Sequence, residues 1–372
     1  MTARADIIPR STLFGRYWRT AVGFWQGRSA AIAWSLTALL ILLVMLQLLV
    51  QYRLNLWNRD FFNALERRAH GALWEQAGLF LPLVAVSAGL AVLAVWARMT
   101  CQRRWRGWLT KNLVERWIRS GGYRQIDLVG GEHQNVEYRI AEDARIATDA
   151  PVDFAVGLLS SLLVGATFVS VLWNVGGDIL IELAGGSFAL PGYLVVAAAA
   201  YSFATTSGTL IIGRRMVDVV ERKNQAESEL KYAAAHLRES AQNGHIDLVA
   251  ERTNVQTALK RMLTTWQKLA GQHMRTTVIS HSNTLLAPVV GLILCAPKYL
   301  AGVMHLGEVT QAAAAFVAVQ GAFNWLVDNY PRLADWVSSV NRVANLLLVL
   351  DQYEEPKAAD PAGADQAIRT AE

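Results

Sequence analysis

Acidic side chains are the groups in this sequence best placed for chemistry, and that chemistry would be proton exchange. A carboxylate in a partly dehydrated cavity has a raised pKa, so it can bind and release a proton near neutral pH. Only Asp153 falls inside the long apolar segments, at the edge of one of them. The candidate proton carriers outside those segments are Glu142, Asp143, Glu227, Glu229 and Glu239.

The simpler interpretation of these acids is that they are solvated or paired with arginine. Acids on amphipathic helices usually have one of these two surroundings, and a nearby cation favours the charged carboxylate. Arg139 and Arg238 are the expected partners. Both interpretations stay open from the sequence, because the partner of each acid depends on which helices lie together.

Other kinds of catalytic chemistry find no support in the residue pattern. We see no Ser-His-Asp set, no catalytic Cys–His pair and no metal-ligand spacing around Cys101 or Cys295. A phosphate-binding P-loop needs the pattern GxxxxGK[ST], and none of the seven lysines follows a glycine. About 45 residues follow the last apolar segment, which is short of a nucleotide-binding domain. We therefore expect no cofactor, no metal and no ATP hydrolysis by this chain alone.

Six long apolar segments must position these residues. Each is close to the ~20 residues that cross about 30 Å of hydrocarbon as a helix. The chain is 53% hydrophobic and 17% charged, whereas a soluble domain carries about 25% charged residues. The alternative, buried helices of a large soluble protein, fits the number and length of the segments poorly. The sequence predicts an all-α protein of the lipid bilayer with six spans, near 31–50, 77–97, 152–175, 190–213, 277–296 and 309–327.

Lysine and arginine are distributed unevenly between the loops. The stretch 98–151 carries ten and the stretch 214–276 carries eleven, whereas 176–189 carries none. By the positive-inside rule both long stretches and both termini are cytoplasmic, as in a multi-pass protein of the cell inner (plasma) membrane. This topology explains the basic residues, so the net charge of +5 does not indicate nucleic acid. The first apolar segment is too long for a cleavable signal peptide.

Both long polar stretches are predicted to be helical hairpins that extend the membrane helices into the cytoplasm. Trp105, Leu109 and Leu113 recur at helical spacing, and residues 214–276 are rich in strong helix formers. Gly121-Gly122 and Asn243-Gly244 interrupt the two stretches and are the expected tips. We divide the chain into a cytoplasmic segment at 1–30, a membrane domain at 31–350, and a flexible tail at 351–372 that is rich in Pro, Ala, Asp and Glu.

Four segments together resemble a known family. They are LNLWNRDFFNALERR at 54–68, RWRGWLTKNLVERWI at 104–118, NVEYRIAED at 135–143 and the long segment at 300–336. As a set they are similar to the SbmA/BacA-like peptide transporters within the ABC-D-like group, although Val136, Glu137 and Tyr138 depart from the family pattern. The positions that match its motifs are Asn55, Asn63, Arg104, Trp105, Arg106, Arg139, Arg238, Gly307, Gln311 and Phe316.

The resemblance implies the transmembrane domain of a type I ABC exporter, assembled as a homodimer and without its own nucleotide-binding domain. It implies transport of peptides or similar amphiphilic compounds, driven by the proton gradient. Glu227 matches a family glutamate, and Glu142 with Asp143 matches an acidic pair. Two alternatives stay open: a permease that works with a separate ATP-binding chain, and a membrane scaffold that transports nothing. Pro288, within the fifth span, is a possible hinge.

Overall fold

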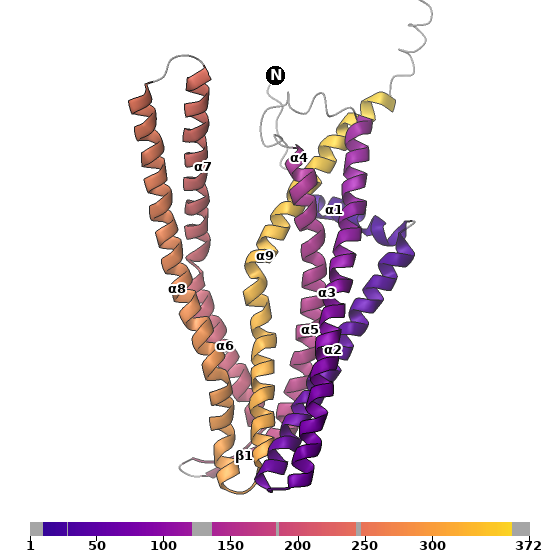
Figure 1. Cartoon of the computed structure of the whole chain (residues 1–372), viewed down its shortest axis with the longest axis vertical. Helices are drawn as coiled ribbons and strands as arrows, with labels where there is room; N and C mark the ends of the chain where they lie inside the picture. The colour runs from indigo at the N-terminus through magenta and orange to yellow at the C-terminus, as the bar shows by residue number, and fades with distance from the viewer. Residues whose placement is uncertain (1–9, 28, 121–135, 184–185, 243–246, 359–372) are drawn as a thin grey trace, which may run out of the picture. The chain divides into compact units, whose positions relative to one another are not determined.

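The computed structural model describes residues 10–27, 29–120, 136–183, 186–242 and 247–358, and Figure 1 shows their helices and strands. The chain is almost entirely helical within these ranges. The elements are α1 (Arg10–Gln26), α2 (Ala30–Glu66), α3 (His70–Ser120), α4 (Val136–Tyr138), the π-helical turn η3 (Arg139–Asp143), α5 (Ala144–Gly176), β1 (Asp178–Leu183), β2 (Gly186–Pro191), α6 (Tyr193–Gly213), α7 (Met216–Gln242), α8 (Leu248–Leu300) and α9 (Leu306–Ala358).

Six helical stretches in the described residues are long and apolar enough to cross a membrane, which confirms the predicted fold class. Five of them contain a predicted span in full, and the fourth contains all of its span except residues 190–192. The fourth span begins at Tyr193 rather than at residue 190, because residues 186–191 form strand β2. A protein of this composition keeps its backbone satisfied in hydrocarbon by forming helices, since every N–H and C=O then bonds within its own segment.

Two compact units make up the chain. Unit 1 comprises Met1–Ala166 and Asp328–Glu372, and unit 2 comprises Thr167–Val327. Helices α5 and α9 contribute residues to both units. Unit 1 therefore contains α1, α2, α3, α4, η3 and parts of α5 and α9, and unit 2 contains the β-hairpin, α6, α7, α8 and the remaining parts of α5 and α9.

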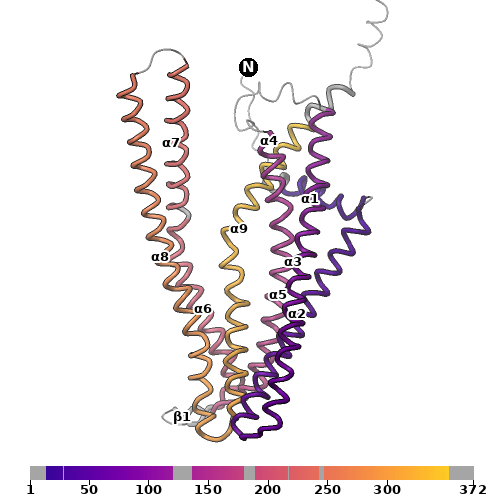
Figure 2. The backbone as a smooth tube through the Cα atoms, in the orientation of Figure 1, coloured from indigo at the N-terminus to yellow at the C-terminus, as the bar shows by residue number. Residues whose placement is uncertain are grey.

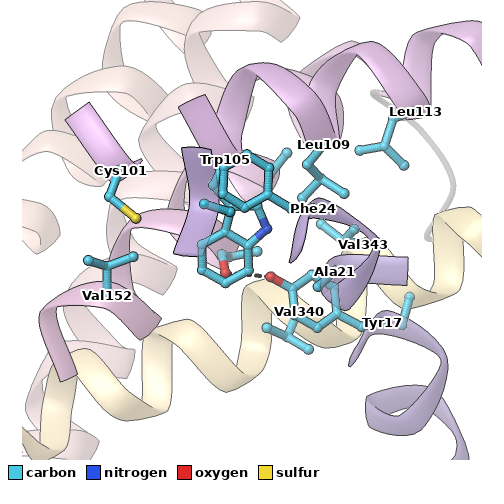
Figure 3. Packing of buried hydrophobic residues seen from close by; sticks show 14 of the residues in the cluster. Tyr17, Ala21, Phe24, Cys101, Trp105, Leu109, Leu113, Val152, Val340 and Val343 are labelled. Carbon is cyan, nitrogen blue, oxygen red and sulfur yellow. Dashed lines mark hydrogen bonds between the residues drawn. The ribbon is translucent and has the colours of Figure 1, made fainter. Parts of the chain in front are cut away.

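Aromatic and aliphatic side chains from several helices form the core of unit 1 (Figure 3). The predicted apolar stripe is confirmed, because Trp105, Leu109 and Leu113 of α3 are all essentially inaccessible to solvent. Their spacing of four residues places them on one face of the helix, and that face contacts α1 and α9 residues of the core. Tyr17 adds a tether, since its hydroxyl donates to the carbonyl of Ala147, 2.5 Å away.

Helix α1 is an element that the sequence reading did not identify. Tyr17, Ala21 and Phe24 follow the spacing of one helical face, and all three are buried in the core of unit 1. Arginine and other polar residues are interspersed among the apolar residues of the helix, so its average hydrophobicity is too low to stand out beside the membrane spans. The spacing of its buried residues does predict a short amphipathic helix.

A long two-helix hairpin dominates unit 2 (Figure 2). Helix α7 packs along α8, and α6 packs on α8 as well. Asp247 caps α8, because its carboxylate accepts from the backbone N–H groups of Val249 and Ala250. The hairpin predicted for 214–276 is thus present. The predicted tips, Gly121-Gly122 and Asn243-Gly244, lie outside the described residues.

A short β-hairpin joins the third and fourth membrane helices, where the sequence suggested only a short loop. Strands β1 and β2 pair antiparallel, with Asp178 opposite Pro191 and Leu183 opposite Gly186. Gly177 and Gly192 flank the hairpin with φ of 56° and 60°, a region that glycine adopts readily. Helix α9 also differs from the prediction, since it continues to Ala358 and not only to residue 350.

Candidate functional site in the polar contacts of the membrane helices

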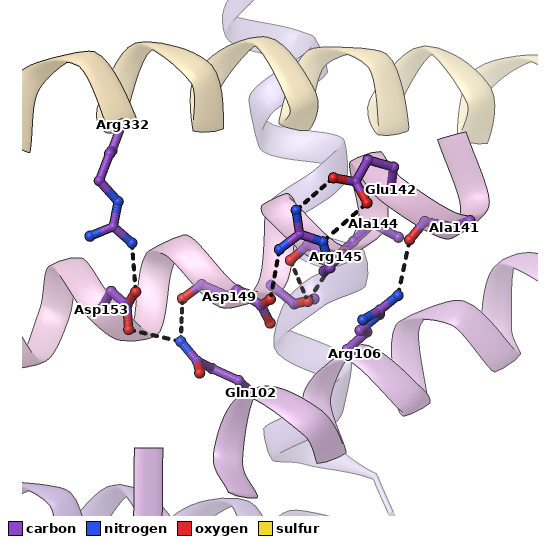
Figure 4. Close-up of polar contacts among 10 residues, drawn as sticks. Gln102, Arg106, Ala141, Glu142, Ala144, Arg145, Asp149, Asp153 and Arg332 are labelled. Atoms are coloured by element: carbon purple, nitrogen blue, oxygen red, sulfur yellow. Dashed lines mark hydrogen bonds and ion pairs between the residues drawn. The ribbon is translucent and has the colours of Figure 1, made fainter. Parts of the chain in front are cut away.

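Asp153 links three helices of unit 1 at the start of the third predicted span (Figure 4). Its Oδ1 accepts a hydrogen bond from Gln102 of α3 at 2.8 Å, and its Oδ2 accepts from Arg332 of α9 at 2.7 Å. The Nε of Arg98 lies 3.6 Å from Oδ1. The only acid that the sequence places within the spans is therefore an ion-paired contact between α3, α5 and α9.

Asp143 is the most deeply buried acid among the predicted proton carriers, and it is also paired. Its side chain is 1% exposed, and both carboxylate oxygens accept from Arg342 of α9, at 2.6 and 2.8 Å. Arg342 donates in addition to the hydroxyls of Ser338 and Ser339. This bidentate contact holds the π-helical turn η3 against α9, in the geometry that makes arginine–carboxylate pairs strong.

Glu142, the neighbour of Asp143, has a separate partner on its own helix. Arg145 donates to both of its carboxylate oxygens, at 2.5 and 3.1 Å (Figure 4). This hydrogen bonding lowers the pKa of Glu142 below its ordinary value. Arg106, a motif position, donates to the backbone carbonyl of Ala141 at 3.2 Å. Arg106 thus joins α3 to the π-helical turn η3, whereas the ion pair of Glu142 with Arg145 is local to the junction of η3 and α5.

Glu227 and Glu229 lie on α7 and contact cations of the same hairpin. Lys223 lies 3.1 Å from Glu227, and the indole N–H of Trp266 on α8 donates to the same carboxylate oxygen at 3.2 Å. Hydrogen bonding to Lys223 is the main cause that lowers the pKa of Glu227. Glu229 accepts from Arg261 of α8 at 2.9 Å.

A proton carrier that works near neutral pH needs the opposite surroundings, namely dehydration without a close cation. In this structure Glu142, Asp143, Glu227 and Glu229 all have cationic partners, and Glu239 is exposed near the end of α7. The sequence had singled out Arg139 and Arg238 as partners. The four contacts instead involve cations that it had not singled out: Lys223, Arg145, Arg261 and Arg342.

Unit 2 contains a polar cluster inside the membrane-spanning segments, which the sequence reading missed. The amide of Gln320 on α9 accepts from Ser202 of α6 and donates to Thr205, both at 2.7 Å, and Asn283 of α8 lies 3.5 Å away. Ser202 and Gln320 are each 3% exposed. Polar side chains in a span generally pair with one another and mark pathways for substrates or ions.

The sequence feature that could have indicated this cluster is the presence of a glutamine and an asparagine within two predicted spans. Gln320 falls in the sixth span and Asn283 in the fifth. A sequence cannot tell whether such residues face each other, because their relative rotation depends on helix packing. Thr206 of α6 and Asn324 of α9 form a further polar contact, at 3.4 Å.

The remaining motif positions are spread over several helices. Trp105, Gln311 and Phe316 are buried, as are Asn55 and Arg139, so these five contribute to packing. Arg104 and Arg238 are exposed, and Gly307 lies buried at the start of α9. Asn63 is half-buried in α2. Pro288 lies inside α8, which continues through it, and the hinge stays a prediction.

One more charged contact was not foreseen. Glu251 of α8 is 8% exposed, and its carboxylate lies 2.8 Å from Nδ1 of His236 on α7. The pair sits near the end of the hairpin, in a stretch where the sequence shows only helix-forming composition. Within the described ranges, no group of three or more His, Cys, Asp or Glu side chains could hold a metal ion.

Six membrane-crossing helices, with two pairs continued by long polar extensions, define a transporter-type transmembrane domain. The chain belongs to the ABC transporter transmembrane region 2 family, whose model matches residues 25–300. This membership supports the sequence resemblance at the level of the ABC-D-like group.

Curated relatives agree with the family. The chain is 24% identical over 380 residues to the inner membrane ABC transporter ATP-binding protein YddA of Escherichia coli, covering 96% of this chain and 65% of that protein. It is 21% identical to ABC transporter D family member 2, chloroplastic, of Arabidopsis thaliana, covering 91% and 46%. An uncharacterized ABC transporter ATP-binding protein of Haemophilus influenzae is 21% identical, with 87% and 55% covered. The chain thus spans between about half and two thirds of the length of these relatives.

Proposed function

We propose that this chain forms half of a translocation pathway for peptides or similar amphiphilic compounds, and that two copies assemble to complete it. The observation that carries the proposal is the buried cluster of Ser202, Thr205, Asn283 and Gln320 inside the spans of unit 2. Burying amides and hydroxyls in hydrocarbon is costly. In a transport pathway such residues can contact polar cargo, whereas a helix bundle with only a structural role does not need them.

We propose that ATP binding supplies the energy, through an ATP-binding domain that acts with this membrane domain. Three relatives are named as ABC transporters, two of them as ATP-binding proteins, and this chain matches only part of each. The pairing of Glu227 points the same way, since hydrogen bonding to Lys223 lowers the pKa of Glu227 and a proton carrier near neutral pH needs a raised one.

The second candidate is transport driven by the proton gradient, as the resemblance to SbmA/BacA-like transporters implies. One contact favours it. His236 and the buried Glu251 lie 2.8 Å apart on facing helices of the hairpin, and chains of acidic and histidine side chains are the usual proton relays of transporters. For either energy source we propose an inner-membrane location with both termini in the cytoplasm, on the charge distribution between loops.

The test is uptake of a fluorescent amphiphilic peptide by cells that express the chain. Gln320→Leu removes the amide of the polar cluster and should reduce the initial uptake rate by about tenfold, because a bond to each of its neighbours is lost. Gln47→Leu, which changes a half-buried glutamine of the first span outside the cluster, is the matched control. Uptake that is equal in both variants would contradict the proposed pathway.

The same assay separates the two energy sources. Depletion of cellular ATP at a maintained pH gradient should stop uptake, and an uncoupler added while ATP is maintained should not. The reverse result would establish the proton-driven candidate in place of the ATP-driven one.

A further inference from the structure

An apolar cavity lies within unit 1, apart from the polar cluster and the charged contacts described above. Its volume is about 280 Å³, and four helices enclose it. Trp18 and Trp25 of α1 form one wall, and Ile41 of α2 forms another. Cys101, Trp105 and Val152, which are labelled in Figure 3, line it from α3 and α5.

The lining excludes water and suits hydrocarbon. Its polar side chain, Thr37, is already satisfied, because its hydroxyl accepts from the N–H of Trp25 at 3.2 Å and donates to the carbonyl of Ala33. Apolar cavities of about 150 Å³ stay dry and bind benzene. A cavity of this larger size has room for a segment of a hydrocarbon chain, but it is smaller than most pockets that enclose a whole drug-sized ligand.

The position of the cavity matches the boundary between membrane and cytoplasm that the charge distribution assigns. Ile41 and Val152 belong to predicted spans, whereas Cys101 and Trp105 follow the end of the second span at residue 97. Trp18 is 47% exposed although it lines the cavity, so the cavity reaches the surface of the unit beside α1.

Helix α1 has the composition of a helix that lies on an anionic membrane surface. It carries Arg10, Arg16 and Arg19 and no acid. Phe14 and Trp18 stack with ring centroids 6.4 Å apart, and both are exposed. Aromatic side chains and arginines on one short helix favour the headgroup region of anionic lipids.

We propose that the cavity binds one acyl chain of an anionic phospholipid, with its headgroup beside Arg19 of α1. Arg19 is exposed and follows Trp18 at the mouth of the cavity in the sequence.

The experiment uses the full chain in phosphatidylcholine nanodiscs that contain a trace of phosphatidylglycerol with a photoactivatable diazirine in one acyl chain. After illumination, the attached lipid is located on peptides by mass spectrometry. Labelling should concentrate on peptides that contain the cavity residues. Ala155→Phe, which fills the cavity from α5, should reduce labelling there to the level of random labelling.

Ala91→Phe is the matched control, because Ala91 is exposed on α3 within a predicted span and does not line the cavity. Ile41→Trp fills the same cavity from an exposed position on α2, so a folding defect of either variant alone cannot decide the result. Arg19→Gln should lower labelling by the phosphatidylglycerol probe about fivefold, because the variant loses the attraction of one arginine to an anionic surface. The same diazirine on phosphatidylcholine should label the cavity weakly.

Three results would overturn the proposal. Labelling spread evenly over the lipid-facing helices would mean that the cavity holds no lipid. Labelling unchanged in both filled variants would place the lipid elsewhere. Equal labelling by the two phospholipid probes, or displacement of the phosphatidylglycerol probe by a free fatty acid, would show that an anionic phospholipid is not the occupant.

Discussion

The ion pair of Glu227 with Lys223 determines whether Glu227 can exchange protons during energy coupling. The pKa of Glu227 is lowered in the folded chain, so its interaction with Lys223 is present at any pH above the unfolded value of about 4.3. It is lost only as the pH falls through the lower, folded value. Between about pH 5 and pH 8, this carboxylate therefore stays ionised in the conformation described here.

The first prediction follows from that ionisation. Glu227→Gln should leave the pH dependence of uptake between about pH 5 and pH 8 unchanged, because the group does not titrate there. Glu115→Gln, which removes an exposed acid of similar i,i+4 pairing on α3, is the control. If Glu227→Gln abolishes uptake driven by a pH gradient while peptide binding is retained, Glu227 is a proton carrier in another conformation and the proton-driven candidate is correct.

Asp143 and Arg342 give a second prediction at the same scale. Arg342→Gln leaves the buried carboxylate of Asp143 without its cation, which costs about 3–5 kcal/mol for a fully buried pair. Arg342 is 42% exposed, so solvent screening should reduce the loss to about 1–3 kcal/mol. Arg119→Gln, on an exposed pair, should cost under about 0.5 kcal/mol. Thermal unfolding in detergent measures the loss of stability of both variants. Equal midpoints would show that the buried pair contributes nothing to the stability of the fold.

Elements differ in how much of their structure the sequence could reveal. The six spans were predictable because length and continuous apolarity decide them. The stripe of Trp105, Leu109 and Leu113 was predictable because its spacing alone defines a helical face. Helix α1 was missed because arginine and other polar residues lower its average hydrophobicity, and the β-hairpin was missed because alternation over six residues is a weak signal beside two membrane helices.

The β-hairpin depends on Gly192, which supplies the third prediction. Gly192 has φ of 60°, and an added Cβ would lie 2.4 Å from the ring of Trp173. Gly177 has φ of 56°, and its nearest atom would be Nζ of Lys298 at 3.6 Å. Gly177→Ala should therefore lower the free energy of unfolding only by the conformational cost of a left-handed alanine, about 1–2 kcal/mol. Gly192→Ala should lower the free energy of unfolding by the same conformational cost and by about 1–3 kcal/mol more, because of the clash with Trp173.

Thermal unfolding of the two glycine variants gives the comparison. Trp173→Ala removes the clashing ring, so in that background the two alanine variants should have similar midpoints. A difference that persists without the Trp173 ring would mean that the clash is not the cause.

Contacts between distant parts of the sequence were the least predictable feature of the molecule. Gln320 meets Ser202, and Arg332 meets Asp153, only because particular helices pack with particular rotations. The sequence supplied the residue types and placed the acids near the ends of the spans. It could not supply their partners, so only the structure shows that four of the five candidate proton carriers, Glu142, Asp143, Glu227 and Glu229, are ion-paired.

The final prediction concerns assembly. The α7–α8 hairpin exposes large apolar side chains in a stretch that lies outside the predicted spans, among them Leu248 at 68%, Val249 at 77% and Leu263 at 55%. Exposed apolar surface of this kind in water marks a protein–protein contact. We expect it to be covered by a second copy of the chain, because the resemblance to the SbmA/BacA-like transporters implies a homodimer.

Mass measurement of the protein in lipid nanodiscs should show two chains. Leu263→Glu places a charge on the exposed apolar surface and should shift the population toward one chain, since a desolvated unpaired charge in an interface is costly. Gln256→Glu adds the same charge at an exposed polar position of α8 and should leave the dimer intact. Circular dichroism shows whether each variant keeps its helices. A single chain that is stable and transports peptide would remove the two-copy pathway, and with it the main reason for this hairpin to expose leucine and valine.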